Sequence, residues 1–286
     1  MSNIKSLVAK AYVYSRPNSY QLQFGGRRVT FLTDSAYTKN WYYRNRLRGA
    51  ARGYHEPALT LFLERISSTK KSLLDVGAHL GYFSILFASV PGNNSLAVEL
   101  DPSNYRELCR AIDFQPQQIK TRIKAMNVGI SDESAAIELP QTRPLNSSHR
   151  IELSPSQLTE SVSVDLVTIG QLLRQTSFVP DLVKIDIEGF EVHGLRGTEE
   201  LLGRERPLLL IEVHPSGLMQ VGGSVQELLS ITGAAGYKHF RFLEHRAARG
   251  SPLTDQIQLA CDTNWDLVCV HSSDEDGLAA VGAFLA

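Results

Sequence analysis

One stretch decides the fold of this chain: residues 73–82, which read LLDVGAHLGY. Two leucines lead into Asp75, a turn containing Gly77 and Gly81 follows, and residues 83–88 read as the start of a helix. A strand, a glycine-containing turn and a helix form the opening unit of doubly wound α/β folds, whose ligands bind at the carboxyl ends of the strands. Because glycine has no Cβ atom, it lets the backbone approach a ligand closely. We therefore predict a ligand site at this turn, with Asp75 suited to a cationic group.

The spacing within the turn distinguishes two cofactors. A dinucleotide turn requires G-x-G-x-x-G, but the second glycine position holds His79 and the third holds Tyr82. The turn of S-adenosylmethionine enzymes, acid-x-G-x-G-x-G, matches at Asp75, Gly77 and Gly81, with His79 at the middle glycine. Histidine is among the side chains enriched at positive φ. The turn favours S-adenosylmethionine, and an ordinary strand-to-helix turn without a cofactor is the alternative.

A second acid supports the same cofactor. Residues 95–98 read as a short apolar strand that leads into Glu99, which follows Gly77 at about the 20-residue offset where an acid binds ribose hydroxyls. A carboxylate can accept two hydroxyl hydrogen bonds at once. We predict that Glu99 binds the ribose and that Asp75 lies near the methionine amine, rather than that Glu99 is a solvated charge at a strand end.

Composition narrows the class of protein. The 286 residues suit one large domain, with or without an N-terminal extension, and 43% hydrophobic residues are ample for a core. The 29 basic residues nearly balance the 30 acidic ones, so no net charge recruits nucleic acid or an acidic membrane. No apolar run reaches the roughly 18 residues of a membrane span. Cys109, Cys261 and Cys269 are too scattered for a disulfide framework or a zinc site. We expect a cytoplasmic protein that binds neither nucleic acid nor membrane.

Residues 1–70 differ in composition from the rest of the chain and are expected to form a cap that consists of a hairpin and helices. Residues 20–24 and 28–32 alternate around a glycine pair, which is a hairpin signal. Residues 41–48 interleave aromatic and basic side chains that suit nucleobase stacking, but in a neutral chain a helix with one packed face is favoured. Residues 56–66 read as a further helix, with proline in its first turn.

Residues 71–286 are expected to form one Rossmann-like domain, because strand and helix patterns alternate as in a parallel sheet. Residues 131–164 are less regular and are expected to be a loop or insertion with one strand at 160–164, and the end of the chain from Ser273 is expected to fray. The predicted strands are 72–76, 95–99, 121–128, 181–187, 207–213, 236–243 and 265–271. The predicted helices are 81–89, 102–112, 165–175, 189–202 and 224–235.

Two further strands carry charge at their ends. In residues 182–190, LVKIDIEGF, the side chains of Lys184, Asp186 and Glu188 share one face of the predicted strand. Charges on a central strand are costly unless they are paired or lie at its open end. We therefore expect Asp186 and Glu188 at the mouth of the site, and Lys184 as a structural partner of acids on the neighbouring strands.

The neighbouring acids come from the cofactor strand and from residues 207–215, PLLLIEVHP. If the sheet has the strand order usual for S-adenosylmethionine enzymes, the strands of Asp75 and Glu212 flank that of Lys184, and these two acids are its expected partners. His214 shares a face with Glu212 and is expected near the mouth of the site.

Five motifs in this order resemble the FkbM family of S-adenosylmethionine-dependent methyltransferases. The resemblance covers roughly residues 54–215, and its most specific part is the KIDIEG block. It implies a Rossmann-like class I methyltransferase sheet of seven strands, with the last strand antiparallel, and usually methyl transfer to a hydroxyl. The motifs are DVGAHLG at 75–81, ELDP at 99–102, NVGISD at 127–132, KIDIEG at 184–189 and IEVHP at 211–215.

By position, the resemblance implies a set of cofactor contacts. Asparagine is usual in the family where this chain has His79, and Leu100-Asp101 lengthens the family's usual E-P pair. Both departures touch predicted cofactor contacts rather than the fold. The implied contacts are Asp75, Gly77, Ala78, His79 in the same turn, Gly81 and Glu99, with Asn127 near the adenine.

These features favour an S-adenosylmethionine-dependent O-methyltransferase that acts on a hydroxyl of a small molecule or sugar. A catalytically inactive methyltransferase-like interaction module is the main alternative, and the altered turn at His79 motivates it. An NAD-dependent oxidoreductase has only the offset of Glu99 in its favour. No motif identifies the methyl acceptor.

The chemistry requires a group that takes the proton of the hydroxyl, within ~3 Å of its oxygen. His214 suits this role by its intrinsic pKa, and Asp186 and Glu188 suit it because neighbouring carboxylates raise one another's pKa. The same three residues suit a divalent ion that lowers the pKa of the hydroxyl. Because Lys184 brings a competing positive charge to the same face, we favour direct base catalysis without a metal, with Asp186 as the first residue to test.

The segment just before the cofactor turn is expected to close over the site. Tyr54, His55 and Glu56 precede the helix that begins at Pro57, and a plain helix cap is the alternative. Deleting residues 1–50 is then expected to cost activity more than stability.

Overall fold

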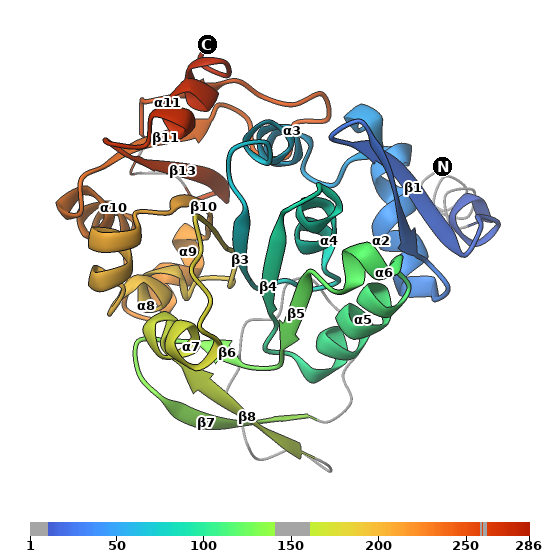
Figure 1. The fold of residues 1–286 in the computed structure, drawn as a ribbon, viewed down its shortest axis with the longest axis horizontal. Helices are drawn as coiled ribbons and strands as arrows, with labels where there is room; N and C mark the ends of the chain where they lie inside the picture. Colours follow the sequence, from blue (N-terminus) through green and yellow to red (C-terminus); the bar gives the residue numbers. More distant parts are fainter. Residues whose placement is uncertain (1–10, 141–160, 258, 260–261) are drawn as a thin grey trace.

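The computed structural model describes residues 11–140, 161–257, 259 and 262–286 and is centred on an eight-stranded sheet (Figure 1). The strand order is β12–β11–β13–β10–β9–β3–β4–β5. The five strands from β10 to β5 run parallel, and β13 is antiparallel to both of its neighbours. The strands are β3 (Ser72–Val76), β4 (Asn94–Val98), β5 (Ile123–Met126), β9 (Leu182–Ile185), β10 (Leu208–Val213), β11 (Tyr237–Phe242), β12 (Leu253–Thr254) and β13 (Trp265–His271).

This order confirms the predicted Rossmann-like sheet of seven strands with an antiparallel last strand. The two-residue β12 adds an eighth strand at one edge. Every residue of β9, β10 and β13 is buried, as expected where helices cover both faces of a sheet.

Helices cover the two faces as two separate cores. One face packs against α3 (Pro57–Ile66), α4 (Tyr82–Ser89), α5 (Pro102–Asp113) and α11 (Glu275–Gly282). The other packs against α7 (Ile169–Thr176), α8 (Glu191–Leu195) and α10 (Val225–Ala234). None of the helices in the described ranges is long and apolar enough to cross a membrane.

The carboxyl-terminal end does not fray as expected. Asp274 caps α11 by accepting a hydrogen bond from the backbone N–H of Gly277, and Val281 is buried in the core beside α3. An N-cap and a buried apolar side chain are the two features that fix a terminal helix. The prediction that the chain frays from Ser273 was wrong. The helix is fixed by one capping residue and one buried side chain, and so short a pattern is hard to recognise in the sequence.

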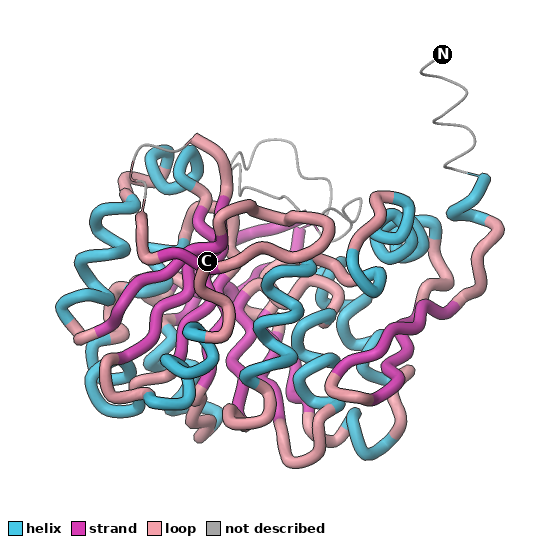
Figure 2. Tube along the Cα trace, turned by 90° about the horizontal axis from the view of Figure 1, so that it is seen from above, coloured by secondary structure: helices cyan, strands magenta, loops and turns pink. Residues whose placement is uncertain are grey.

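The amino-terminal hairpin is confirmed. β1 (Ser19–Phe24) pairs antiparallel with β2 (Arg27–Leu32), and the two glycines between them both have positive φ, as a tight hairpin turn requires. The hairpin lies outside the helices that flank the central sheet (Figure 2). The helix expected at 41–48 is the longer α2 (Ala36–Leu47), which buries Tyr42 and Tyr43.

One hydrophobic core runs from this segment into the main sheet. Phe31 stacks on both Tyr42 and Tyr82, with ring centroids 4.9 and 5.4 Å apart, and Tyr82 belongs to α4. Deleting residues 1–50 would therefore remove part of this core, so the truncation does not separate a lid function from stability as the sequence suggested.

The irregular stretch after β5 contains a second sheet. β6 (Gly129–Ile130), β8 (Ser161–Val167) and β7 (Ala135–Pro140) form three strands in that order. The strand expected at 160–164 is therefore confirmed and β7 was missed. The proline-rich stretch 141–160 and Cys261 lie outside the described residues.

Two helix predictions were wrong in their limits. The helix expected from 165 begins at Ile169, because β8 continues to Val167 and Thr168 forms the N-cap. The single helix expected at 189–202 is divided into α8 and a short η3 (Leu201–Glu205), with Gly197 between them at a φ of +74°. The short η1 (Ala51–Gly53), α6 (Gln117–Lys120) and α9 (Pro215–Gln220) were also missed.

Candidate active site

A cavity of about 340 Å³ lies at the carboxyl ends of β3, β4 and β9. Its size and position are those of small-molecule sites in α/β folds. The strand ends, the second sheet and the amino-terminal segment all contribute to its wall. The lining residues include Trp41, His55, Glu56, Gly77, Ala78, His79, Glu99, Leu100, Asp101, Val128, Gly129, Lys184, Asp186, Glu188 and Arg246.

The predicted cofactor turn has the expected backbone. Gly77, His79 and Gly81 all have positive φ, so the histidine keeps the backbone conformation of the glycine position. The sequence analysis attributed Gly77 and Gly81 to the close approach of a ligand, and the structure shows a further reason. A Cβ atom on Gly77 would collide with the carbonyl oxygen of Asp186, and one on Gly81 would lie 2.6 Å from a methyl group of Leu108. Contacts within the protein, not only ligand approach, exclude side chains there.

Glu99 is held in position at the cavity wall. Its Oε2 accepts a hydrogen bond from the backbone N–H of His79 at 2.8 Å, and its Oε1 accepts one from that of Asp101 at 2.9 Å. Burial raises the pKa of Glu99 to about 7, although these hydrogen bonds oppose the shift. Each oxygen has a further lone pair, so the carboxylate can also accept hydrogen bonds from a diol.

Two predicted cofactor residues lie behind the cavity wall. Asp75 is fully buried and accepts a 2.6 Å hydrogen bond from the hydroxyl of Ser84. Asn127 donates from Nδ2 to the carbonyl oxygens of Glu99 and Leu100, at 2.8 and 2.9 Å. Neither is among the residues that line the cavity. Their direct contacts with a cofactor stay predictions, and the geometry gives both a positioning role.

Lys184 is a structural partner of acids, as predicted, but one of its partners differs. Its Nζ lies 3.2 Å from Oδ2 of Asp186 and 4.0 Å from Oδ1 of Asp75. β9 lies between β3 and β10, but Lys184 pairs in register with Leu210, two positions before Glu212. Burial lowers the pKa of Lys184, and the surrounding carboxylates more than offset this effect, so the pKa is raised.

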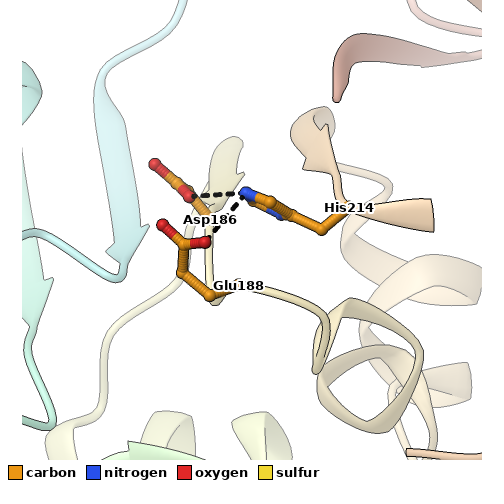
Figure 3. Close-up of side chains that lie close together, drawn as sticks. All are labelled: Asp186, Glu188 and His214. Carbon is orange, nitrogen blue, oxygen red and sulfur yellow. Dashed lines mark ion pairs between the residues drawn. The ribbon is translucent and has the colours of Figure 1, made fainter. Parts of the chain in front are cut away.

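The structure brings Asp186, Glu188 and His214 together (Figure 3). His214 Nε2 lies 3.4 Å from Oε2 of Glu188 and 4.0 Å from Oδ1 of Asp186. Its Nδ1 lies 2.8 Å from Oε1 of Glu191, a buried residue that the sequence analysis missed. Asp186 and Glu188 line the cavity, and His214 lies behind them.

The charges at this cluster disfavour His214 as a free base. Burial lowers the pKa of His214, but the hydrogen bond to Glu191 and the nearby Asp186 raise it, to about 9. A protonated imidazole has no lone pair with which to accept a proton. Burial raises the pKa of Glu188 to about 7.

Aromatic side chains from α2 form a wall that the sequence analysis did not assign to the site. Trp41 lines the cavity, with its ring centroid 4.2 Å from that of His55. The hydroxyl of Tyr37 lies 2.6 Å from Nε2 of His79 in the cofactor turn. The interleaved aromatic and basic run was the available signal, but its contact with the turn depends on tertiary packing.

The predicted closing segment contributes in part. His55 and Glu56 line the cavity, whereas Tyr54 is buried and donates from its hydroxyl to the carbonyl oxygen of Gln23. Burial opposes ionisation of Glu56, but His55 and Arg246 hold its pKa at about 2. Whether the segment closes over a ligand stays a prediction.

Arg246 was not predicted from the sequence. Its guanidinium lies 3.0 Å from Glu212 and 3.2 Å from Glu56, and His245 lies 3.1 Å from Asp266. These cations neutralise a second group of buried acids, Glu56, Glu212 and Asp266. No sequence pattern marks Arg246 and His245, because they follow β11 in an irregular segment.

Comparison with known proteins identifies the family. The FkbM methyltransferase domain matches residues 75–239. The hexuronic acid methyltransferase AglP of Haloferax volcanii is 26% identical over 144 residues, which are 50% of this chain and 55% of AglP, so the chain spans about half the length of that relative.

Two solved structures are also similar. A methyltransferase FkbM from Methylobacillus flagellatus has 17% identity and a TM-score of 0.46, over 70% of this chain and 43% of that one. The METTL16 methyltransferase domain has 14% identity and a TM-score of 0.47, over 93% and 92% of the two chains. Because the FkbM methyltransferase domain matches more than half of the present chain, this chain belongs to the FkbM methyltransferase family.

Proposed function

We propose that this protein transfers a methyl group from S-adenosylmethionine to a hydroxyl oxygen of a small molecule or sugar. One observation carries the proposal: a single cavity joins the glycine turn and Glu99 to the carboxylates of Asp186 and Glu188. Family membership supports methyl transfer. The relative AglP, named as a hexuronic acid methyltransferase, supports a sugar acceptor.

The residues present fit this cofactor. When bound, S-adenosylmethionine supplies a methyl group on a positively charged sulfur. Glu99 is positioned to accept hydrogen bonds from the ribose, and Leu100 and Val128 offer apolar surface to the adenine.

The other end of the cavity suits a polar acceptor with an apolar face. Trp41, His55 and Phe83 provide aromatic surface, and Glu56 and Arg246 provide charged groups at the same wall. Sites of this kind orient a ligand with a few polar groups on a mainly apolar lining. A sugar ring presents both kinds of surface.

Transfer requires that the acceptor hydroxyl lose its proton as its oxygen attacks the methyl carbon. The O–CH₃ bond forms while the S–CH₃ bond breaks, and the sulfur keeps the electron pair. Asp186, Glu188 and His214 are the groups placed to activate that hydroxyl.

Transfer of an isotope-labelled methyl group tests the proposal. The purified chain is incubated with labelled S-adenosylmethionine and a panel of hexuronic acids, neutral sugars and small alcohols, and products are read by mass spectrometry. We expect label on a hydroxyl oxygen. Label on the carboxylate oxygen of a hexuronic acid, as a methyl ester, or transfer to no compound of the panel would contradict the proposed acceptor class.

A further inference from the structure

We propose that Asp186, Glu188 and His214 form a site for one divalent cation of the Mg²⁺ or Mn²⁺ class, which activates the acceptor hydroxyl. The role of the ion rests on the proposed function, whereas the site is inferred from its own geometry. Direct base catalysis was favoured from the sequence, and the structure removes the reason for that preference.

The three side chains converge at the spacing of ligands that share one ion (Figure 3). His214 Nε2 is 3.4 Å from Oε2 of Glu188 and 4.0 Å from Oδ1 of Asp186, and one ligand atom from each residue lies within 4.8 Å of the others. Ligand atoms placed about 2.0–2.6 Å from one ion are roughly 3–4 Å apart. Little movement is therefore needed to bind it.

Carboxylates surround one nitrogen of His214 at distances longer than those of a direct pair. His214 is only 3% exposed, and its Nε2 lies 3.4 Å from Oε2 of Glu188, 3.7 Å from Oε1 of Glu212, which Arg246 already neutralises, and 4.0 Å from Oδ1 of Asp186. A direct pair with a carboxylate would bring the two atoms to about 2.7–2.9 Å, yet the nearest carboxylate oxygen is 3.4 Å away. A nitrogen and two carboxylate oxygens held just beyond hydrogen-bond distance point to an ion between them.

In two of the proposed ligands, His214 and Asp186, the polar atom that does not face the ion already has a partner in the protein. His214 Nδ1 contacts Glu191, the carboxylate–histidine arrangement found behind metal ligands, and Nε2 is left for the ion, whose binding displaces the proton from that nitrogen. Lys184 contacts Oδ2 of Asp186 and leaves Oδ1, the oxygen nearer His214. Lys184, whose positive charge argued against a metal, therefore orients Asp186, one of the proposed metal ligands.

The backbone fixes the third ligand. Glu188 adopts a left-handed conformation with φ of +55°, which is strained for a residue with a side chain. Gly189 follows with φ of +111°, and a Cβ atom there would lie 2.6 Å from Cα of Gly217 in α9. This close packing holds the turn and presents Glu188 to the cavity.

The second acid group is a poorer site. Arg246 contacts Glu56 and Glu212, and His245 contacts Asp266, so cations of the protein already occupy that place. At the proposed site two carboxylates and one imidazole leave coordination positions open toward the cavity. Oxygen-rich sets of this kind suit Mg²⁺ or Mn²⁺. A hydroxyl bound there would have a lowered pKa and would release its proton to solvent.

Binding of Mn²⁺ to the full chain, stripped with a chelator and without S-adenosylmethionine, tests the site. Calorimetry and electron paramagnetic resonance should show one ion per chain. Glu188→Gln, which keeps the shape of the side chain, should weaken binding at least about tenfold, because a charged ligand becomes neutral. Glu200→Gln is the matched control, since that carboxylate is exposed and pairs with Arg204.

Three results would overturn the site. They are no Mn²⁺ binding by the wild-type chain at millimolar ion, unchanged binding in Glu188→Gln, and a larger loss of binding in Glu212→Gln than in Glu188→Gln, which would assign the ion to the second acid group. Circular dichroism of each variant confirms that it is folded. S-adenosylmethionine binding is measured in the same samples, so a chain that binds Mn²⁺ but no cofactor would refute the proposed function and leave the site standing.

Discussion

Replacing Glu99 with alanine is expected to weaken S-adenosylmethionine binding by about 1.5–3 kcal/mol, the range for hydrogen bonds to a charged group. This corresponds to a dissociation constant roughly 10 to 150 times larger. The structure supports the upper part of the range. The carboxylate also accepts hydrogen bonds from the backbone N–H groups of His79 and Asp101, and the variant would leave both without that partner.

Calorimetric titration measures this change directly. Glu107→Ala is the matched control, because that carboxylate pairs with Arg110 on the same helix and does not line the cavity. Thermal unfolding of both variants shows how much of the effect comes from the loosened turn. An unchanged affinity in a folded Glu99→Ala chain would refute the assignment of Glu99 to the ribose.

The other expected outcomes concern pH, chemistry, the aromatic wall and the turn. In calorimetry, cofactor affinity should increase as the pH rises through about 7, because burial raises the pKa of Glu99 to that value and the protonated form accepts fewer hydrogen bonds; Glu99→Gln should not show this dependence. Steady-state kinetics of Asp186→Asn and His214→Ala should show turnover lowered by ~10²-fold or more, with nearly unchanged cofactor affinity. Trp41→Ala should raise the KM for a sugar acceptor about 2- to 10-fold through lost stacking, with a smaller change in cofactor affinity. Gly77→Val should lower the Tm as well as abolish binding, since its side chain would collide with the carbonyl oxygen of Asp186.

The central sheet could be predicted because its signals are local. Buried parallel strands read as apolar runs of fixed length, and the turn at Gly77 and Gly81 marks where the first strand ends. Asp186, Glu188 and His214 were expected near the mouth of the site because each is a charged or titratable side chain at the end of a predicted strand, and the family's strand order makes those strands neighbours. The structure confirms that these three side chains converge.

The remaining features depend on contacts that no short stretch encodes. Lys184 faces Asp186 rather than Glu212 because of the register between β9 and β10. Trp41 reaches the cavity through the packing of α2, and Arg246 through an irregular segment after β11. The role of Gly77 was misread for the same reason, since the atom that excludes a side chain belongs to a distant strand.

Calorimetric titration of the full wild-type chain with S-adenosylmethionine, and separately with NAD, tests the central claim most directly. The cavity geometry predicts saturable binding of one S-adenosylmethionine per chain and no binding of NAD, because the turn lacks the second and third glycines that a dinucleotide requires. Absence of S-adenosylmethionine binding at millimolar ligand would contradict the account and favour an inactive interaction module. Binding of NAD instead would assign the cavity to a different chemistry.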